Sequence, residues 1–214
     1  MIEIKKLSFG YANSTPLFED LSFTVGDGEQ LFLKGDSGRG KTTLLYCLCG
    51  IIPRNIAGRL SGSVEIDGKP VAELSNAELP QAVAMVFQEP GSRIFLPSVE
   101  DELAFTLENL CVPPEDMRER IAHALELTSL TSKRHTNPAE LSGGQIKLLA
   151  FAAVLAMPPR VLLFDEITAG LDAAAVDRLK LGLDRLKSNG TAIIISEHHT
   201  GIWGERGKHS ELRI

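Results

Sequence analysis

The feature that most constrains this chain is a glycine-rich stretch at residues 35–43, which reads Gly-Asp-Ser-Gly-Arg-Gly-Lys-Thr-Thr. An apolar run at residues 31–33 precedes it, and a helix-like run at residues 44–48 follows it. This order of strand, glycine-rich loop and helix matches the pattern G-x-x-x-x-G-K-[ST] of a phosphate-binding loop. The stretch therefore predicts a strand–loop–helix unit that holds an anion, and it favours an α/β fold.

The residue types of this loop fit nucleotide chemistry. Its three glycines lack a Cβ, so we expect left-handed backbone that points N–H groups at a phosphate. Lys41 can reach the β- and γ-phosphates, and the Thr42 hydroxyl can bind Mg²⁺. The helix that begins near Lys41 directs its positive end at the same anion. The alternative is a glycine-rich turn that precedes a helix by chance. The predicted nucleotide-binding residues are Gly35, Asp36, Ser37, Gly38, Arg39, Gly40, Lys41, Thr42 and Thr43.

Composition limits the other possibilities. The 214 residues, 43% of them hydrophobic, suffice for one domain, or for one domain with a subdomain. The net charge of −6 argues against nucleic acid as a partner. The three cysteines have no metal-ligand spacing and are expected to be reduced thiols. No apolar run approaches the roughly 18–20 residues that cross a bilayer, so a membrane role would require a partner chain.

Strand patterns and helix patterns alternate along the chain, which predicts a parallel sheet with helices on both faces. Residues 89–158 are predicted to form an inserted, mainly helical subdomain. The loop at residues 58–62 and the polar tail at residues 201–214 carry no regular pattern. Strands are expected at residues 2–9, 20–26, 31–33, 63–66, 82–87, 161–164 and 192–195, and helices at residues 99–130, 141–158 and 173–187.

Two further motifs carry chemistry. An apolar run at residues 161–164 ends in Asp165 and Glu166, at the strand end where open α/β sheets bind ligands. Asp165 is predicted to hold Mg²⁺ and Glu166 to polarise an attacking water, although a solvated acid pair is the alternative. Residues 141–145, Leu-Ser-Gly-Gly-Gln, place Ser142 as the N-cap of a helix that could bind a second anion. From spacing alone, an ordinary helix cap is the preferred interpretation.

Residues 141–145 resemble the signature sequence of ATP-binding cassette (ABC) proteins, and five motifs stand in the order of that family over about residues 2–200. The resemblance implies an α/β P-loop NTPase in which residues 1–214 form a single nucleotide-binding domain. Its expected parts are a RecA-like mixed sheet core, an antiparallel β subdomain and the helical insertion at residues 89–158. The implied activity is ATP hydrolysis, with ATP and Mg²⁺ as cofactors.

The resemblance also implies residue roles. Tyr11 matches the aromatic residue that stacks on adenine, and Gln88 the glutamine that contacts Mg²⁺ and the attacking water. His198 matches the switch histidine at the γ-phosphate, with His199 as the alternative. Residues 169–172 match the loop that crosses a dimer interface. The γ-phosphate of an ATP held by an opposite subunit would contact the signature residues Ser142, Gly143, Gly144 and Gln145.

A finer resemblance lies in residues 86–95 and 98–105, which look like the ATPase subunits of energy-coupling-factor importers of vitamins and transition-metal ions. It implies an integral membrane partner that docks near residues 88–105, at the cytoplasmic face of the cell membrane. Two ATPase subunits, identical or different, would close head-to-tail around two ATP molecules and drive import of a small molecule, vitamin or metal ion. The alternatives are an exporter subunit, a soluble ABC ATPase that acts on DNA or ribosomes, and a non-hydrolysing regulatory subunit.

Several positions depart from the family pattern. The family often has Gln or Glu and then Arg at the two positions where this chain has Lys147 and Leu148. Because leucine cannot make the polar contacts of arginine, we expect that contact at Leu148 to be lost or replaced. Ile167 replaces a usual proline, Ala169 a frequent serine and Arg93 a frequent glutamine of the importer group. None of these changes removes a phosphate, metal or water ligand, so hydrolysis is expected to survive.

Overall fold

The computed structural model describes residues 1–12, 14–197, 203 and 209–214. The chain forms two compact units. The first, here called the core unit, comprises Met1–Met85, Pro159–Glu166 and Asn189–Ile214, and the second, the helical unit, comprises Val86–Pro158 and Ile167–Ser188. Within the described part of the chain, no helix is both long enough and apolar enough to cross a membrane.

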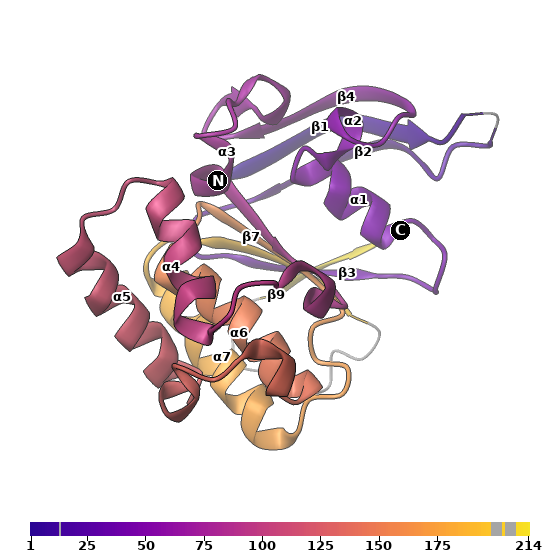
Figure 1. Ribbon diagram of the computed structural model, residues 1–214. Coiled ribbons are helices and arrows are strands. Elements are labelled where there is room, and N and C mark those ends of the chain that lie inside the picture. The colour runs from indigo at the N-terminus through magenta and orange to yellow at the C-terminus, as the bar shows by residue number, and fades with distance from the viewer. Residues whose placement is uncertain (13, 198–202, 204–208) are drawn as a thin grey trace. The chain divides into compact units, whose positions relative to one another are not determined.

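The core unit is built on two sheets (Figure 1). The antiparallel sheet has the order β2-β1-β4-β5, and the second sheet has the order β6-β7-β8-β3-β9, in which β7, β8, β3 and β9 pair in parallel. This arrangement confirms the predicted α/β class. The strands are β1 (Ile2–Gly10), β2 (Phe18–Val25), β3 (Gln30–Lys34), β4 (Arg59–Ile66), β5 (Lys69–Pro70), β6 (Val83–Val86), β7 (Val161–Asp165), β8 (Ala192–Ser196) and β9 (His209–Arg213).

Two interior strands of this sheet, β7 and β8, are buried along their whole length. Every residue of β7 and of β8 is buried, as expected for a sheet that is covered on both faces. Helix α1 (Lys41–Leu48) packs Leu44, Leu45 and Leu48 into the same hydrophobic cluster. The remaining helical segments of this unit are α2 (Ile51–Arg54), η1 (Val71–Glu73) and α3 (Leu79–Ala82). This core fixes the ends of β3, β7 and β8, which carry the candidate site.

The helical unit has a hydrophobic core of its own. Helix α4 buries Val99, Leu103 and Leu107, which recur every fourth residue and so share one helix face. The expected helix over residues 99–130 is wrong in its length, because Cys111 adopts φ 55° and two prolines follow, which divide it. Its elements are η2 (Pro90–Arg93), α4 (Val99–Asn109), α5 (Pro114–Leu127), η3 (Thr131–Lys133), η4 (Pro138–Glu140), α6 (Gly143–Ala156) and α7 (Ala173–Ser188).

Two regions expected to be irregular form strands. Residues His209–Arg213 form β9, which pairs with β3 along the edge of the parallel sheet. Strand β4 begins at Arg59, inside the predicted loop, and pairs with β1 across a bulge. Gly62 makes that bulge possible, because it adopts φ 84° and a Cβ there would lie 2.3 Å from the Lys6 carbonyl oxygen.

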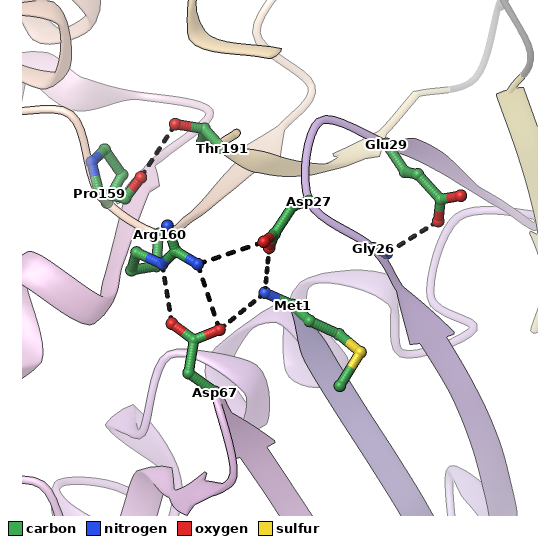
Figure 2. Close-up of polar contacts among 8 residues, drawn as sticks. All are labelled: Met1, Gly26, Asp27, Glu29, Asp67, Pro159, Arg160 and Thr191. Carbon is green, nitrogen blue, oxygen red and sulfur yellow. Dashed lines mark hydrogen bonds and ion pairs between the residues drawn. The ribbon is translucent and has the colours of Figure 1, made fainter. Parts of the chain in front are cut away.

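A polar cluster joins the turns before the parallel strands β3 and β7 to the start of β1 and the turn between β4 and β5 (Figure 2). Arg160 donates from Nε to Asp67 Oδ2 at 2.7 Å and from Nη2 to Asp27 Oδ2 at 3.3 Å, and the amino group of Met1 contacts both aspartates. Hydrogen bonding to Arg160 lowers the pKa of Asp67. In the same turns, the buried Thr191 hydroxyl donates to the Pro159 carbonyl at 3.0 Å. These contacts fix the amino ends of β7 and β8, while the candidate site lies at their carboxyl ends.

Candidate nucleotide site

The phosphate-binding loop follows β3 and leads into α1, as predicted. Gly38 and Gly40 adopt φ 81° and φ 95°, so the expected left-handed backbone is confirmed at these two positions. The same expectation is wrong for Gly35, whose φ is not positive. A glycine is needed at this position because another part of the backbone approaches it closely. A Cβ at Gly35 would lie 2.9 Å from the carbonyl oxygen of Ile214, which follows β9. Residues 36–39 are exposed and so are open to a ligand.

Lys41 is buried, and its ammonium group lies against the loop. Its Nζ donates to the carbonyl oxygens of Gly35 at 2.8 Å and Asp36 at 3.1 Å. Helix α1 begins after Gly40, and none of the described side chains caps it there. The ammonium group and the first N–H groups of α1 together provide the positive field that a nucleotide phosphate requires.

Thr42 and Asp165 bring the loop and the end of β7 together. The Thr42 hydroxyl donates to Asp165 Oδ2 at 2.8 Å. Asp165 is 4% exposed, and its Oδ1 has no hydrogen-bond partner among the described residues. Burial raises the pKa of Asp165, and the charge of Glu166 adds to this effect, whereas the Thr42 hydrogen bond opposes it. The Ser196 hydroxyl is near enough to lower this pKa as well, although it lacks the geometry of a formed hydrogen bond.

This pair fits Mg²⁺. A carboxylate and a hydroxyl are oxygen ligands of the kind that Mg²⁺ prefers, and the unpartnered Asp165 Oδ1 leaves coordination capacity. In the described part of the chain, no group of three or more His, Cys, Asp or Glu side chains could hold a metal ion. A bound Mg²⁺ would thus take few ligands from the protein and the others from phosphates and water, as is usual at nucleotide sites.

Glu166 stands at the end of β7 in an unusual backbone conformation. Its φ is 48°, in the left-handed region that costs a non-glycine residue about 1–2 kcal/mol. Its N–H donates to the Ser196 carbonyl oxygen at 2.9 Å, which fixes the backbone there. The residue is partly exposed, and the buried Ile167 follows it. The side chain of Glu166 is therefore partly accessible at the carboxyl end of β7, while its backbone is fixed by the hydrogen bond to Ser196.

Tyr11 is 39% exposed, so its ring is accessible. Its hydroxyl lies 3.2 Å from Thr43 Oγ1, and its ring meets Phe9 edge to face with centroids 5.1 Å apart. These contacts bring Tyr11 to the first turn of α1, beside the phosphate-binding loop.

The signature segment lies in the helical unit and begins α6. Ser142 is the N-cap of this helix, as predicted. Its hydroxyl accepts from the Gln145 N–H at 3.3 Å, and Gln145 Oε1 accepts from the Ser142 N–H at 2.9 Å. Sequence reasoning did not identify this capping box, although its signal, serine with glutamine three residues later, was present. Ser142 and Gly143 are exposed, and no atom of a described residue lies within 4 Å of a Cβ built at Gly143.

Lys147 accounts for one departure from the family pattern. Its Nζ donates to the carbonyl oxygens of Ala169 and, at 3.4 Å, Ile167, so it fixes the following loop to α6. Leu148 is buried in the hydrophobic cluster of the helical unit. At this point of α6 the polar contacts thus come from Lys147, whereas Leu148 packs in the core.

The remaining predicted residues belong to the helical unit or lie outside the described residues. Gln88 is exposed and belongs to the helical unit. The Arg93 guanidinium stacks on the Phe87 ring at 3.6 Å, which gives this departure a structural role. His198 and its alternative His199 lie outside the described residues.

The sequence and the fold were compared with known proteins. The pattern of the ABC transporter family matches residues 18–169. A putative ABC transporter ATP-binding protein of Pyrococcus abyssi is 43% identical over 94% of this chain and 72% of its own length. The energy-coupling factor transporter ATP-binding protein EcfA of Methanocaldococcus jannaschii is 37% identical over 94% of this chain and 71% of its own.

Solved structures agree with this result. The structure of cbiO1 from Clostridium perfringens, described as part of the ABC transporter complex cbiONQ, superposes with a TM-score of 0.80. It is 30% identical in sequence, and the match covers 94% of this chain and 79% of that one. A dimeric post-hydrolysis ATP-binding cassette bound to ADP and Pi, 22% identical, has the same fold, with a TM-score of 0.78 over 94% of this chain and 90% of that one. From its motifs, its fold and these relatives, the chain belongs to the ABC transporter family and is an ATPase domain of that family.

Proposed function

We propose that this chain binds and hydrolyses ATP as the subunit that drives a membrane importer. The observation that carries the proposal is the arrangement at the carboxyl edge of the parallel sheet. Buried Lys41 lies on the phosphate loop, Thr42 is bonded to Asp165, and Glu166 follows at the strand end. These groups supply the parts that phosphoryl transfer requires: a phosphate cradle, metal ligands and a group that orients water.

Each residue has a defined task in this mechanism. Lys41 and the first amides of α1 bind the β- and γ-phosphates, and Tyr11 stacks on the adenine. Thr42 and Asp165 would hold Mg²⁺, which would supply positive charge to neutralise the charge that develops on the phosphates. Glu166 accepts a hydrogen bond, and then the proton, from the attacking water. Gln88 and His198 complete the water and γ-phosphate contacts.

The site is proposed to be completed by a second ATPase subunit, either another copy of this chain or a related one. The exposed Ser142 caps the N-terminus of α6, whose N–H groups favour an anion. The two glycines that follow allow an anion to approach the backbone closely. The signature residues, including Gln145, would contact the γ-phosphate of an ATP held by the opposite phosphate loop. ATP would then close the dimer, and hydrolysis would reopen it.

The membrane partner is proposed to dock near residues 88–105. This segment of the helical unit exposes Phe95, 70% accessible, in edge-to-face contact with the exposed Phe105. Exposed aromatic side chains of this kind are enriched at protein interfaces. The names of two relatives, an energy-coupling factor transporter protein and a part of the ABC transporter complex cbiONQ, support a transporter subunit. The cargo is proposed to be an imported small molecule, vitamin or metal ion. Such a subunit would lie peripherally on the cytoplasmic face of the membrane.

Affinity purification from detergent-solubilised membranes of the source organism tests this proposal. We expect an integral membrane protein to co-purify in stoichiometric amount, and ATP hydrolysis by the complex to require Mg²⁺. Recovery of the chain on ribosomes or DNA, with no membrane protein, would favour the soluble ATPase instead. The net charge of −6 weighs against that alternative.

A further inference from the structure

Two buried polar atoms at the end of the parallel sheet have no hydrogen-bond partner among the described residues. Ser196 is 0% exposed and Asp165 is 4% exposed. Neither Ser196 Oγ nor Asp165 Oδ1 makes a hydrogen bond to any residue that the structure describes. One atom belongs to a hydroxyl that can donate, and the other to a carboxylate that can accept. Leaving both unsatisfied is costly, since a buried polar group without a partner retains its full desolvation penalty.

The strand register places these two residues next to each other. Asp165 ends β7 and Ser196 ends β8, and the two are direct partners in the parallel pairing of these strands. Neighbouring strands lie about 4.8 Å apart, and side chains at paired positions point to the same face of a sheet. A rotation of the Ser196 hydroxyl therefore brings it to Asp165 Oδ1, directly or through one buried water.

Ser196 also contacts the second acid of the pair. Its carbonyl oxygen accepts the Glu166 N–H at 2.9 Å, and Glu166 is the residue held in the left-handed region at φ 48°. A strained backbone persists only where its surroundings hold it. One residue at the end of β8 is thus in position to orient both Asp165 and Glu166.

We propose that Ser196 is a positioning residue of the ATPase site, whose hydroxyl holds Asp165 Oδ1 while its carbonyl group holds the Glu166 amide. This inference rests on the proposed function, because it assumes that Asp165 serves Mg²⁺ and nucleotide. The Thr42 hydroxyl donates to Asp165 Oδ2, and a Mg²⁺ ion held by Thr42 would compete for that hydroxyl. The Ser196 hydroxyl would then still hold the Asp165 carboxylate in place. A carboxylate oxygen has two lone pairs, so Oδ1 can accept from Ser196 and still serve the metal or one of its waters.

The test compares nucleotide binding by the full chain at different Mg²⁺ concentrations. In the first titration, a fluorescent ATP analogue is added to the protein in EDTA, which gives the affinity without metal. In the second, the analogue is held at a fixed concentration and Mg²⁺ is increased, which gives a Mg²⁺ midpoint. For Ser196→Ala we expect the same affinity as the unaltered chain in EDTA, but a Mg²⁺ midpoint about tenfold higher, which corresponds to about 1.4 kcal/mol. Ser196→Thr, which retains the hydroxyl, should restore the midpoint. Ser196→Cys, a weaker donor of similar size, should shift it in the same direction as alanine if the alanine variant is too unstable to measure.

Thr191→Val is the matched control. Thr191 is a buried hydroxyl residue next to the opposite end of β8, where it donates to Pro159 and not to the site (Figure 2). Its loss should lower thermal stability without moving the Mg²⁺ midpoint. An unchanged Mg²⁺ midpoint in Ser196→Ala and Ser196→Cys, or an equal shift in Thr191→Val, would overturn the role of Ser196 but leave the proposed function standing. If the unaltered chain shows no Mg²⁺-dependent nucleotide binding, the proposed function fails and this inference fails with it.

Discussion

Replacement of Asp165 by asparagine should stabilise the protein when no metal or nucleotide is present. Asp165 is a buried carboxylate, and burial together with the charge of Glu166 raises its pKa. The asparagine oxygen can still accept from Thr42, while the buried charge and its repulsion with Glu166 disappear. Gains at such functional sites are typically about 1 kcal/mol, which corresponds to about 2–4 °C in Tm for a domain of this size.

The pH dependence follows from the direction of that pKa shift. Because the folded-state pKa is raised, the folded protein binds the Asp165 proton more tightly than the unfolded chain does. The contribution of Asp165 to the stability of the unaltered chain therefore rises as pH falls through its folded-state pKa toward the unfolded value, and the advantage of Asp165→Asn is present at neutral pH and fades in acid. Thermal unfolding in EDTA between pH 4.5 and pH 8, followed by circular dichroism, measures this difference.

The same melting experiment with Mg²⁺ and ATP should reverse the order of stability. A ligand that binds only the folded state stabilises it by mass action, and the asparagine variant has lost a charged metal ligand. We expect a clear Tm increase for the unaltered chain and little for the variant. An asparagine variant that is less stable in EDTA at neutral pH, or whose advantage does not shrink in acid, would refute this reasoning about the buried carboxylate.

Three further predictions concern single side chains. Glu166→Gln should lower ATP turnover at least 100-fold, because the group that accepts the water proton is lost, and ATP-bound dimers should accumulate in size-exclusion chromatography; unchanged turnover would contradict the assignment. Lys147→Met should release the Ile167 and Ala169 carbonyls and lower turnover several-fold, with Lys147→Arg as the control that retains donors. Arg134→Met should cost about 1 kcal/mol in urea unfolding at pH 7, because Arg134 makes a two-point pair with Glu100 and lowers its pKa. That cost should vanish as pH falls through the lowered pKa of Glu100, and a pH-independent cost would point to lost packing instead.

Much of the fold and most of the site could be predicted from the sequence, because the signals are local. The phosphate loop and the acid pair at the end of β7 each lie within a few consecutive residues, as does the serine cap of α6. Strand β9 could not be predicted in this way, because its polar residues pair with β3, which lies about 180 residues earlier in the chain. The start of β4 also depends on distant residues, since its bulge at Gly62 fits against the backbone of β1.

The same distinction applies inside the site. The role of Ser196 depends on its register with Asp165 on a neighbouring strand, and no motif in the sequence marks it. The contact of Lys147 with the loop after β7 likewise joins residues that are about 20 positions apart. Contacts of this kind arise from tertiary packing, so periodicity and motif spacing do not reveal them.

The central claim is that each ATP site needs two subunits, and a mixing experiment tests it most directly. Lys41→Ala disables the phosphate loop but keeps the signature, whereas Ser142→Arg blocks the signature but keeps the loop. Each variant should be nearly inactive alone. In an equal mixture half of the dimers carry one intact site of two, so about a quarter of the unaltered activity should return. Activity in the mixture no greater than that of the separate variants, or full activity of Ser142→Arg alone, would contradict the account.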